Sequence, residues 1–201
     1  MAISRASDSS IQDGLPKYND IWDGFTATSA FDSLGSVLVG SSGQLSVTFS
    51  NIPQTYTHLQ LRILWRDNRS NAGDGSYAEL TFNGITTGVY SYHQLYGFGT
   101  TSVGAAQNST YANIELTRMP DNAATSGIFG QTIVDILDYT STNKAKTIRA
   151  IGGYDTNSKG ASYLYSGGWH STPAAITSLS IKDGGGTLFL ENSHFALYGI
   201  K

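Results

Sequence analysis

The chain has 201 residues, of which only 13% are charged, with a net charge of −3 and no cysteine. This length fits one β-sandwich, and folding a chain of this size buries roughly 70% of the surface that its unfolded form exposes. The lack of cysteine excludes thiol catalysis, disulfide bonds and cysteine-ligated zinc. Because the sequence has no basic cluster and no apolar run near roughly 20 residues, we expect neither nucleic-acid binding nor a membrane-spanning helix.

Residues 1–23 differ in composition from the rest of the chain. They are polar and rich in serine, so they cannot bury enough apolar surface to fold alone. We expect an extended N-terminal arm over 1–23 that either stays loose or becomes ordered against a partner. Its apolar side chains are costly to leave in water, so they are the candidates for anchoring the arm to a partner. These candidates are Ile11, Leu15, Pro16, Tyr18, Ile21 and Trp22.

Residues 24–201 are expected to form one β domain. From Phe25 onward apolar residues alternate with polar ones, and turn residues recur at short intervals. The expected strands lie near 44–49, 59–65, 77–82, 85–90, 111–118, 128–139, 146–151, 162–169, 176–182, 187–190 and 194–200. Because no crossover helix separates them, the pattern predicts an all-β fold, a jelly-roll-like antiparallel β-sandwich with an extended N-terminal arm.

Two turn sequences predict hairpins. Asn83-Gly84 tolerates the positive φ angles of a type I′ turn, so we expect 77–82 to pair with 85–90. The turn at 183–186, Asp-Gly-Gly-Gly, is expected to join the two strands on either side of it in the same way. We also expect the last strand to be woven into a sheet instead of trailing from it.

The titratable residues form no recognisable catalytic motif. Asp135 and Asp138 lie three apart in an expected strand, so their side chains should point to opposite faces and cannot form the carboxylate pair of a glycosidase. A pair assembled from distant loops, such as Asp67 with Asp155, stays open. The histidines have no metal-binding spacing, so we do not expect them to share a metal ion. They are His58, His93, His170 and His194.

One loop bears a superficial likeness to a calcium-binding loop. The segment 67–75 is rich in Asp, Asn and Gly, but Arg69 stands where an oxygen ligand would be needed. A solvated loop is the simpler interpretation, and a weak calcium site stays open. We therefore expect a non-enzymatic protein that needs no metal and no cofactor.

Aromatic residues recur at even spacing in two segments. Tyr90, Tyr92 and Tyr96 should share one face of a strand, as should the aromatic residues of 163–169. Such a stripe can be core, a subunit interface or a platform for stacking sugars, and tyrosine suits interfaces because its ring packs while its hydroxyl stays wet. The candidates for an interface or glycan platform are Tyr154, Tyr163, Tyr165, Trp169 and His170.

Both ends of the chain resemble virion proteins of tailed bacteriophages. The closing segment 193–201, Ser-His-Phe-Ala-Leu-Tyr-Gly-Ile-Lys, is similar to the "F-x-LYGIK" ending of such proteins, especially those of marine and cyanobacterial phages. The segments 148–155 and 167–169 resemble pieces that these proteins tend to carry, and 9–18 is similar to the N-terminal arms of decoration and fibre proteins. The resemblance covers the arm and roughly the last third of the chain, and its motif includes no catalytic residue.

The resemblance implies a structural protein on the particle surface, made in the host cytoplasm. In the preferred interpretation it is a capsid decoration or cement protein, a homotrimer that binds the major capsid protein through its arm and stabilises the head shell. The alternative is a tail-fibre or head-fibre adhesin, whose loops 66–75 and 154–160 would bind host surface glycan. The chain lacks the long repetitive or coiled-coil shaft that holds a fibre tip away from a particle, which favours cement.

Overall fold

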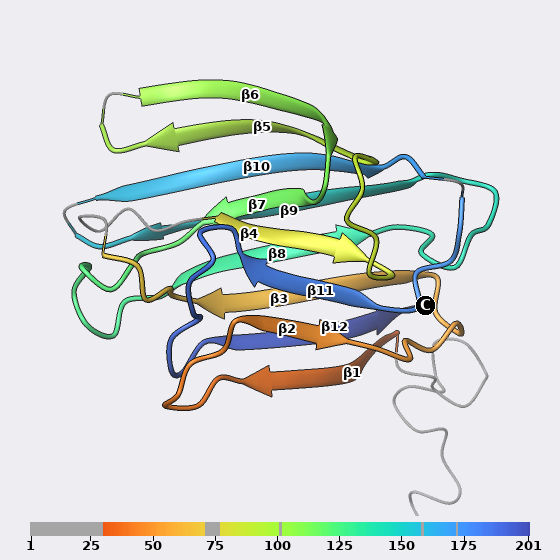
Figure 1. Cartoon of the computed structure of the whole chain (residues 1–201), viewed down its shortest axis with the longest axis horizontal. Coiled ribbons are helices and arrows are strands. Elements are labelled where there is room, and N and C mark those ends of the chain that lie inside the picture. Colours follow the sequence, from red (N-terminus) through yellow and green to blue (C-terminus); the bar gives the residue numbers. More distant parts are fainter. Residues whose placement is uncertain (1–29, 71–76, 101, 158, 172) are drawn as a thin grey trace, which may run out of the picture. The chain divides into compact units, whose positions relative to one another are not determined.

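The computed structural model describes residues 30–70, 77–100, 102–157, 159–171 and 173–201. They form strands, turns and loops without any helix, so none of them belongs to a helix that could cross a membrane. Phe31–Lys201 is one compact unit. Its two antiparallel sheets pack face to face (Figure 1), which confirms the prediction of an all-β sandwich.

The larger sheet has eight strands in the order β1-β12-β3-β8-β9-β10-β5-β6. Its strands are β1 (Phe31–Leu38), β12 (His194–Ile200), β3 (His58–Trp65), β8 (Gly130–Ile136), β9 (Lys146–Asp155), β10 (Gly160–Trp169), β5 (Tyr90–Phe98) and β6 (Ser102–Tyr111). The C-terminal strand β12 lies between β1 and β3, so it is woven into the sheet as the sequence predicted.

The smaller sheet has four strands in the order β2-β11-β4-β7. Its strands are β2 (Ser46–Phe49), β11 (Leu179–Asp183), β4 (Tyr77–Phe82) and β7 (Ile114–Arg118). It covers one face of the larger sheet, called the inner face below, while β5 and β6 extend past its β7 edge (Figure 1). The opposite face of the larger sheet, the outer face, has no second layer in the described part of the chain.

Alternating side chains build the core between the sheets. In β3, Leu59, Leu61 and Ile63 point inward and are almost fully buried, whereas Arg62 between them points outward. Each fully buried side chain of this size contributes about 1.5–3 kcal/mol relative to an exposed one. Farther along, the Trp65 ring meets Phe189 edge-on at 5.3 Å between centroids. The period-two pattern is therefore the direct cause of the layered core.

The hairpin predicted at Asn83-Gly84 is half right. Both residues have positive φ, 52° and 68°, and the Ile85 N–H donates to Phe82 O at 3.0 Å, so the tight turn is present. The pairing was wrong, because β4 lies between β11 and β7 and residues 85–89 form no strand. The chain crosses to the larger sheet, where Tyr90 pairs with Trp169. A turn sequence fixes only the local bend, and the burial of Tyr90 decides where the chain goes next.

The strand predicted at 187–190 is also wrong. The turn at 183–186 forms, with the Gly186 N–H donating to Asp183 O, but the next residues make no continuous ladder. Phe189 instead forms single bridges to Gln44 and Asp67, and it buries its ring in the core. Two strands, β1 and β6, were not expected, because their sequences are rich in Ser, Gly and Ala and do not alternate clearly.

The C-terminal segment is held by a contact that only glycine permits. A Cβ at Gly199 would lie 2.5 Å from Cγ of Tyr56, whose ring covers the strand there. The Tyr56 hydroxyl donates to Oδ2 of Asp32 at 2.9 Å, and the Thr57 N–H donates to Ile200 O at 2.8 Å. The Leu-Tyr-Gly-Ile-Lys ending therefore has a packing reason for its glycine.

We expect Gly199→Ala to destabilise the protein by about 1–3 kcal/mol, because the added methyl group overpacks the site under Tyr56. Equilibrium urea unfolding would measure the change. Gly40→Ala is the matched control, since a Cβ there meets no atom within 4 Å, and it should change stability by less than about 0.5 kcal/mol. Equal effects of the two substitutions would contradict the packing account.

Candidate functional site

The predicted aromatic platform lies on the inner face. Tyr163, Tyr165 and Trp169 alternate along β10 and are 6%, 0% and 2% exposed, and Tyr154 of β9 is 7% exposed. Their rings are thus part of the core of this chain, which was one of the three interpretations of the stripe. His170 follows β10, is exposed, and its Nε2 lies 2.6 Å from Oγ of Ser91. A role of these residues in binding an outside partner stays a prediction.

The tyrosines of β5 and β10 form a continuous stack. Tyr96 lies on Tyr163 with ring centroids 6.0 Å apart and planes at 27°. Tyr163 contacts Tyr165, and Tyr165 contacts Tyr92, each at 5.9 Å between centroids. The stack becomes more exposed toward Tyr96, beside an open groove of about 350 Å³ at the β7 edge of the smaller sheet. Within the described part of the chain, this is the end of the stack that a ligand can reach.

The predicted anchoring residues of the arm, Ile11, Leu15, Pro16, Tyr18, Ile21 and Trp22, lie outside the described residues. Part of the loop 66–75 also lies outside them, whereas the described beginning of this loop is held by hydrogen bonds. The Arg66 guanidinium donates to Ala124 O and Thr125 O, and Oδ1 of the buried Asp67 accepts from the Arg69 N–H at 3.0 Å. These contacts fix the start of the loop in place.

A buried carboxylate, Glu115 of β7, was not among the predicted site residues. The Tyr92 hydroxyl donates a short hydrogen bond to Oε2 of Glu115, and the Asn108 side-chain amide donates to the Tyr92 oxygen at 2.7 Å. The only sequence signal for this network was a charged residue inside the apolar run Ile-Glu-Leu of 114–116. Its partners come from strands that are distant in sequence, so the sequence could not identify them.

A second carboxylate, Glu79, stands directly opposite Glu115 on the neighbouring strand β4. Its Oε2 lies 2.7 Å from Nζ of Lys182 on β11, so this carboxylate is neutralised by an ion pair. Burial raises the pKa of Glu115, and the nearby charge of Glu79 raises it further, whereas the Tyr92 hydrogen bond and Arg118 lower it. The two carboxylates therefore have different partners, a lysine for Glu79 and the Tyr92 hydroxyl for Glu115.

The raised pKa of Glu115 has a defined effect on stability. Its proton is held more tightly in the folded chain than in the unfolded chain. The contribution of Glu115 to stability is therefore full below the unfolded pKa, and it is lost as pH rises through the folded pKa. Tyr92 opposes this loss because its hydroxyl stabilises the ionised carboxylate.

We expect Tyr92→Phe to destabilise the protein by about 1–3 kcal/mol at pH 8, because a buried carboxylate loses its donor. At pH 4 the cost should be smaller, since the protonated carboxyl group needs that donor less. Thermal unfolding at the two pH values measures the difference. Tyr96→Phe is the control on the same face of β5, because among the described residues its hydroxyl has no hydrogen bond. A Tyr92→Phe cost independent of pH would contradict this assignment.

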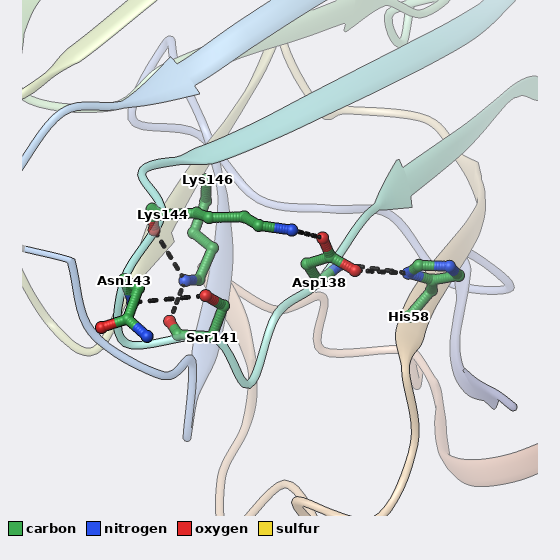
Figure 2. A network of polar contacts seen from close by, with 6 residues as sticks. All are labelled: His58, Asp138, Ser141, Asn143, Lys144 and Lys146. Atoms are coloured by element: carbon green, nitrogen blue, oxygen red, sulfur yellow. Dashed lines mark hydrogen bonds and ion pairs between the residues drawn. The ribbon is translucent and has the colours of Figure 1, made fainter.

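A surface network, shown in Figure 2, closes the turn after β8. Asp138, with a φ of 49°, accepts from Nζ of Lys144 at 2.6 Å, and its backbone N–H donates to Nδ1 of His58 at 3.0 Å. The buried Lys146 donates from Nζ to the carbonyl oxygens of Ser141 and Lys144, and burial lowers its pKa. Every cation here has a partner within the turn, so the network holds the connection between β8 and β9.

The outer face carries exposed apolar side chains in register across several strands. Leu95 of β5 pairs with Leu164 of β10, Leu164 with Ile151 of β9, and Ile151 with Ile133 of β8. Leu95 and Ile151 are each 59% exposed, and Leu164 is 42% exposed. We call this row the apolar stripe, and it consists of Ala105, Leu95, Leu164, Ile151 and Ile133.

Hollows lie on both sides of the apolar stripe. One of about 910 Å³ is lined by Leu64, Val103 and the stripe, with Gly97 and Gly153 leaving space between them. A second of about 710 Å³ is lined by His93, Arg149 and the other side of the stripe. Isolated exposed apolar residues are ordinary, but a contiguous patch is typical of an interaction surface. The outer face is therefore the strongest candidate site for binding a macromolecule.

Sequence reasoning missed this face because it assigned one apolar face to each strand. The available signal was that β9 and β10 carry apolar residues on both faces, with Ile148 and Ile151 in one and Tyr163 and Leu164 in the other. Comparison with known proteins adds no relative, since no family model and no curated protein sequence matches the chain.

Proposed function

We propose that this chain is a structural protein of a tailed-phage virion, a decoration or cement protein that binds and stabilises the head shell. The observation that carries the proposal is the apolar stripe on the uncovered outer face, because a broad sheet face of this kind suits contact with another protein surface. The resemblance of both chain ends to phage virion proteins supports the choice of particle.

The polar groups inside the fold favour a binding protein over an enzyme. Glu79 is paired with Lys182, and Glu115 is held by Tyr92, so these two carboxylates already have partners from their own chain. Among the described residues, no three His, Asp or Glu side chains gather to hold a metal ion. The surface feature that remains without a partner in the described chain is apolar and broad, as protein contacts require.

In this proposal the arm and the β-sandwich have different roles. The arm, with Ile11, Leu15, Pro16, Tyr18, Ile21 and Trp22, fastens the protein to the major capsid protein, and several arms act together in an assembled homotrimer. When several arms are linked in one assembly, the overall affinity rises without any new kind of contact. A protein that binds the assembled shell but not its separate subunits stabilises the shell by mass action. The protein would therefore be located on the head surface.

A fibre adhesin that binds host surface glycan is the second candidate, and one observation favours it. The groove of about 350 Å³ is lined by Tyr96, Phe98 and Arg118, with Gln94 beside them. Aromatic rings next to a guanidinium and an amide can stack on a sugar and bond its hydroxyl groups. The buried Oε1 atom of Gln94 has no hydrogen-bond partner among the described residues, so it could accept one from a ligand.

Labelling intact particles would separate the two candidates. We expect an antibody against this protein, followed by gold-labelled electron microscopy, to mark the whole head surface, because cement proteins cover the shell. Label confined to the tail tip or to sparse projections would contradict the cement role. In that case the groove beside Tyr96 would be the first place to look for glycan binding.

Deleting residues 1–18 tests the role of the arm. We expect the shortened protein to fold, because Phe31–Lys201 is a compact unit of its own, and to lose its association with heads. Circular dichroism measures folding, and co-sedimentation with heads that lack the protein measures binding. Full occupancy of heads by the shortened protein would overturn the anchoring role.

A further inference from the structure

The register of the larger sheet places similar residues on the outer face at equal distances from a central line. Three rows of paired residues cross the six strands β3-β8-β9-β10-β5-β6, and the middle of each row falls between β9 and β10. A two-fold axis that runs parallel to the strands, above this midpoint, would relate the chain to a second copy. The outer faces of the two copies would then pack against each other. Each residue would then oppose the residue equally far from the midpoint on the other side.

Four of the five residues of the apolar stripe would face one another under this operation, and the fifth, Ala105, would face Arg62. Leu164 would face Ile151 of the second copy, and Leu95 would face Ile133, because each pair is equally distant from the midpoint. In the next row Val103 would face Leu64, which are 91% and 45% exposed in the single chain. Each of these contacts occurs twice, so the six side chains of each copy together form one apolar layer between the two sheets.

The polar residues flanking the apolar stripe are complementary as well. In the row on the other side, His93 would face Asp135, and Gln107 would face Gln60. Ser166 would face Arg149 in the same row. In these three rows, no two carboxylates and no two guanidinium groups oppose each other. An apolar centre with a polar flank free of like-charge pairs is the usual anatomy of a specific interface.

The area of the face and one pair of its positions also suit a second copy. In the row with Val103, Gln131 would face Gly97, so a long side chain meets a position without one. Six strands at about 4.8 Å spacing span about 24 Å, and strands of this length run roughly 23–33 Å, so the face measures on the order of 600–800 Å². A standard interface uses about 800 Å² from each partner.

We propose that the outer face of the eight-stranded sheet is an interface between two copies of this chain, related by a two-fold axis between β9 and β10. This proposal assigns the outer face to a second copy and leaves contact with the particle to the arm, so it changes one part of the proposed function, the assembly in which the arms act together. It predicts a dimeric building block in place of the three-fold assembly that the resemblance implies. The molecular mass of the protein in solution distinguishes a dimer from a trimer.

Analytical ultracentrifugation of the full chain tests the interface. We expect a species of twice the 21.5 kDa chain mass at micromolar concentration, and we expect Leu164→Asp to raise the dimer dissociation constant about 100-fold or more, because a charge would be buried beside the axis. Leu45→Asp is the matched control, since Leu45 is 62% exposed but lies outside the outer face, and it should leave the dimer intact.

A charge exchange tests the symmetry itself. His93→Asp should weaken the dimer roughly tenfold, because the new carboxylate would oppose Asp135 of the second copy. Adding Asp135→Lys should restore the affinity, since Asp and Lys then face each other across the axis. Within one chain the two positions lie three strands apart, about 14 Å, which is too far for direct contact.

Three results would overturn the proposal. The first is a monomer at all concentrations, as expected if the first 29 residues of the same chain or another virion protein covers the face. The second is a trimer that Leu164→Asp leaves intact. The third is failure of Asp135→Lys to rescue His93→Asp while circular dichroism shows both variants folded. None of these results tells where the protein lies on a particle, and labelling of particles does not tell the oligomeric state, so the two proposals can fail separately.

Discussion

The unequal width of the two sheets is the constraint on which the rest of the structure depends. Eight strands present one face to a layer of only four, so the inner face is closed over its middle and the outer face has no covering layer among the described residues. The inner face gains its stability from buried Leu, Ile and aromatic side chains. The outer face does not do so within the described part of the chain, yet it carries exposed leucines and isoleucines in register. That asymmetry makes the outer face the candidate surface for binding a macromolecule.

The same width explains the buried polar network. β7 ends the smaller sheet, so its Glu115 lies where the covered inner face gives way to the extension formed by β5 and β6. A carboxylate at such a boundary needs donors from its own chain, and Tyr92, supported by Asn108, supplies them. The tyrosine stack continues from there toward Tyr96 and the open groove. The tyrosines that recur at even spacing in the sequence are thus core at one end of their stack and accessible at the other.

Local patterns predicted well what depends on neighbours in the sequence. Runs of strand-forming residues between turn signals gave the strands Tyr77–Phe82 and His194–Ile200 with their observed bounds, and the turn residues Asn83 and Gly84 have the expected positive φ. Partners distant in sequence were not predicted, because the pairing of Tyr90 with Trp169 depends on which sheet buries it. The strand Ser102–Tyr111 escaped notice because an edge strand exposed on both faces needs no alternation. The apolar stripe was missed for a related reason, since Ile151 and Leu164 occupy positions that a one-sided strand would fill with polar residues.

The central claim, that a second copy covers the outer face, predicts unequal reactivity of two leucines. Leu95 lies in the apolar stripe and Leu45 lies outside the outer face, and in the single chain they are 59% and 62% exposed. Hydroxyl-radical footprinting of the full chain at micromolar concentration, read by mass spectrometry, compares the two side chains in one sample. If a second copy covers the outer face, Leu95 is oxidised several-fold more slowly than Leu45, and Leu164→Asp removes the difference. Equal oxidation rates in the unmodified chain would contradict it.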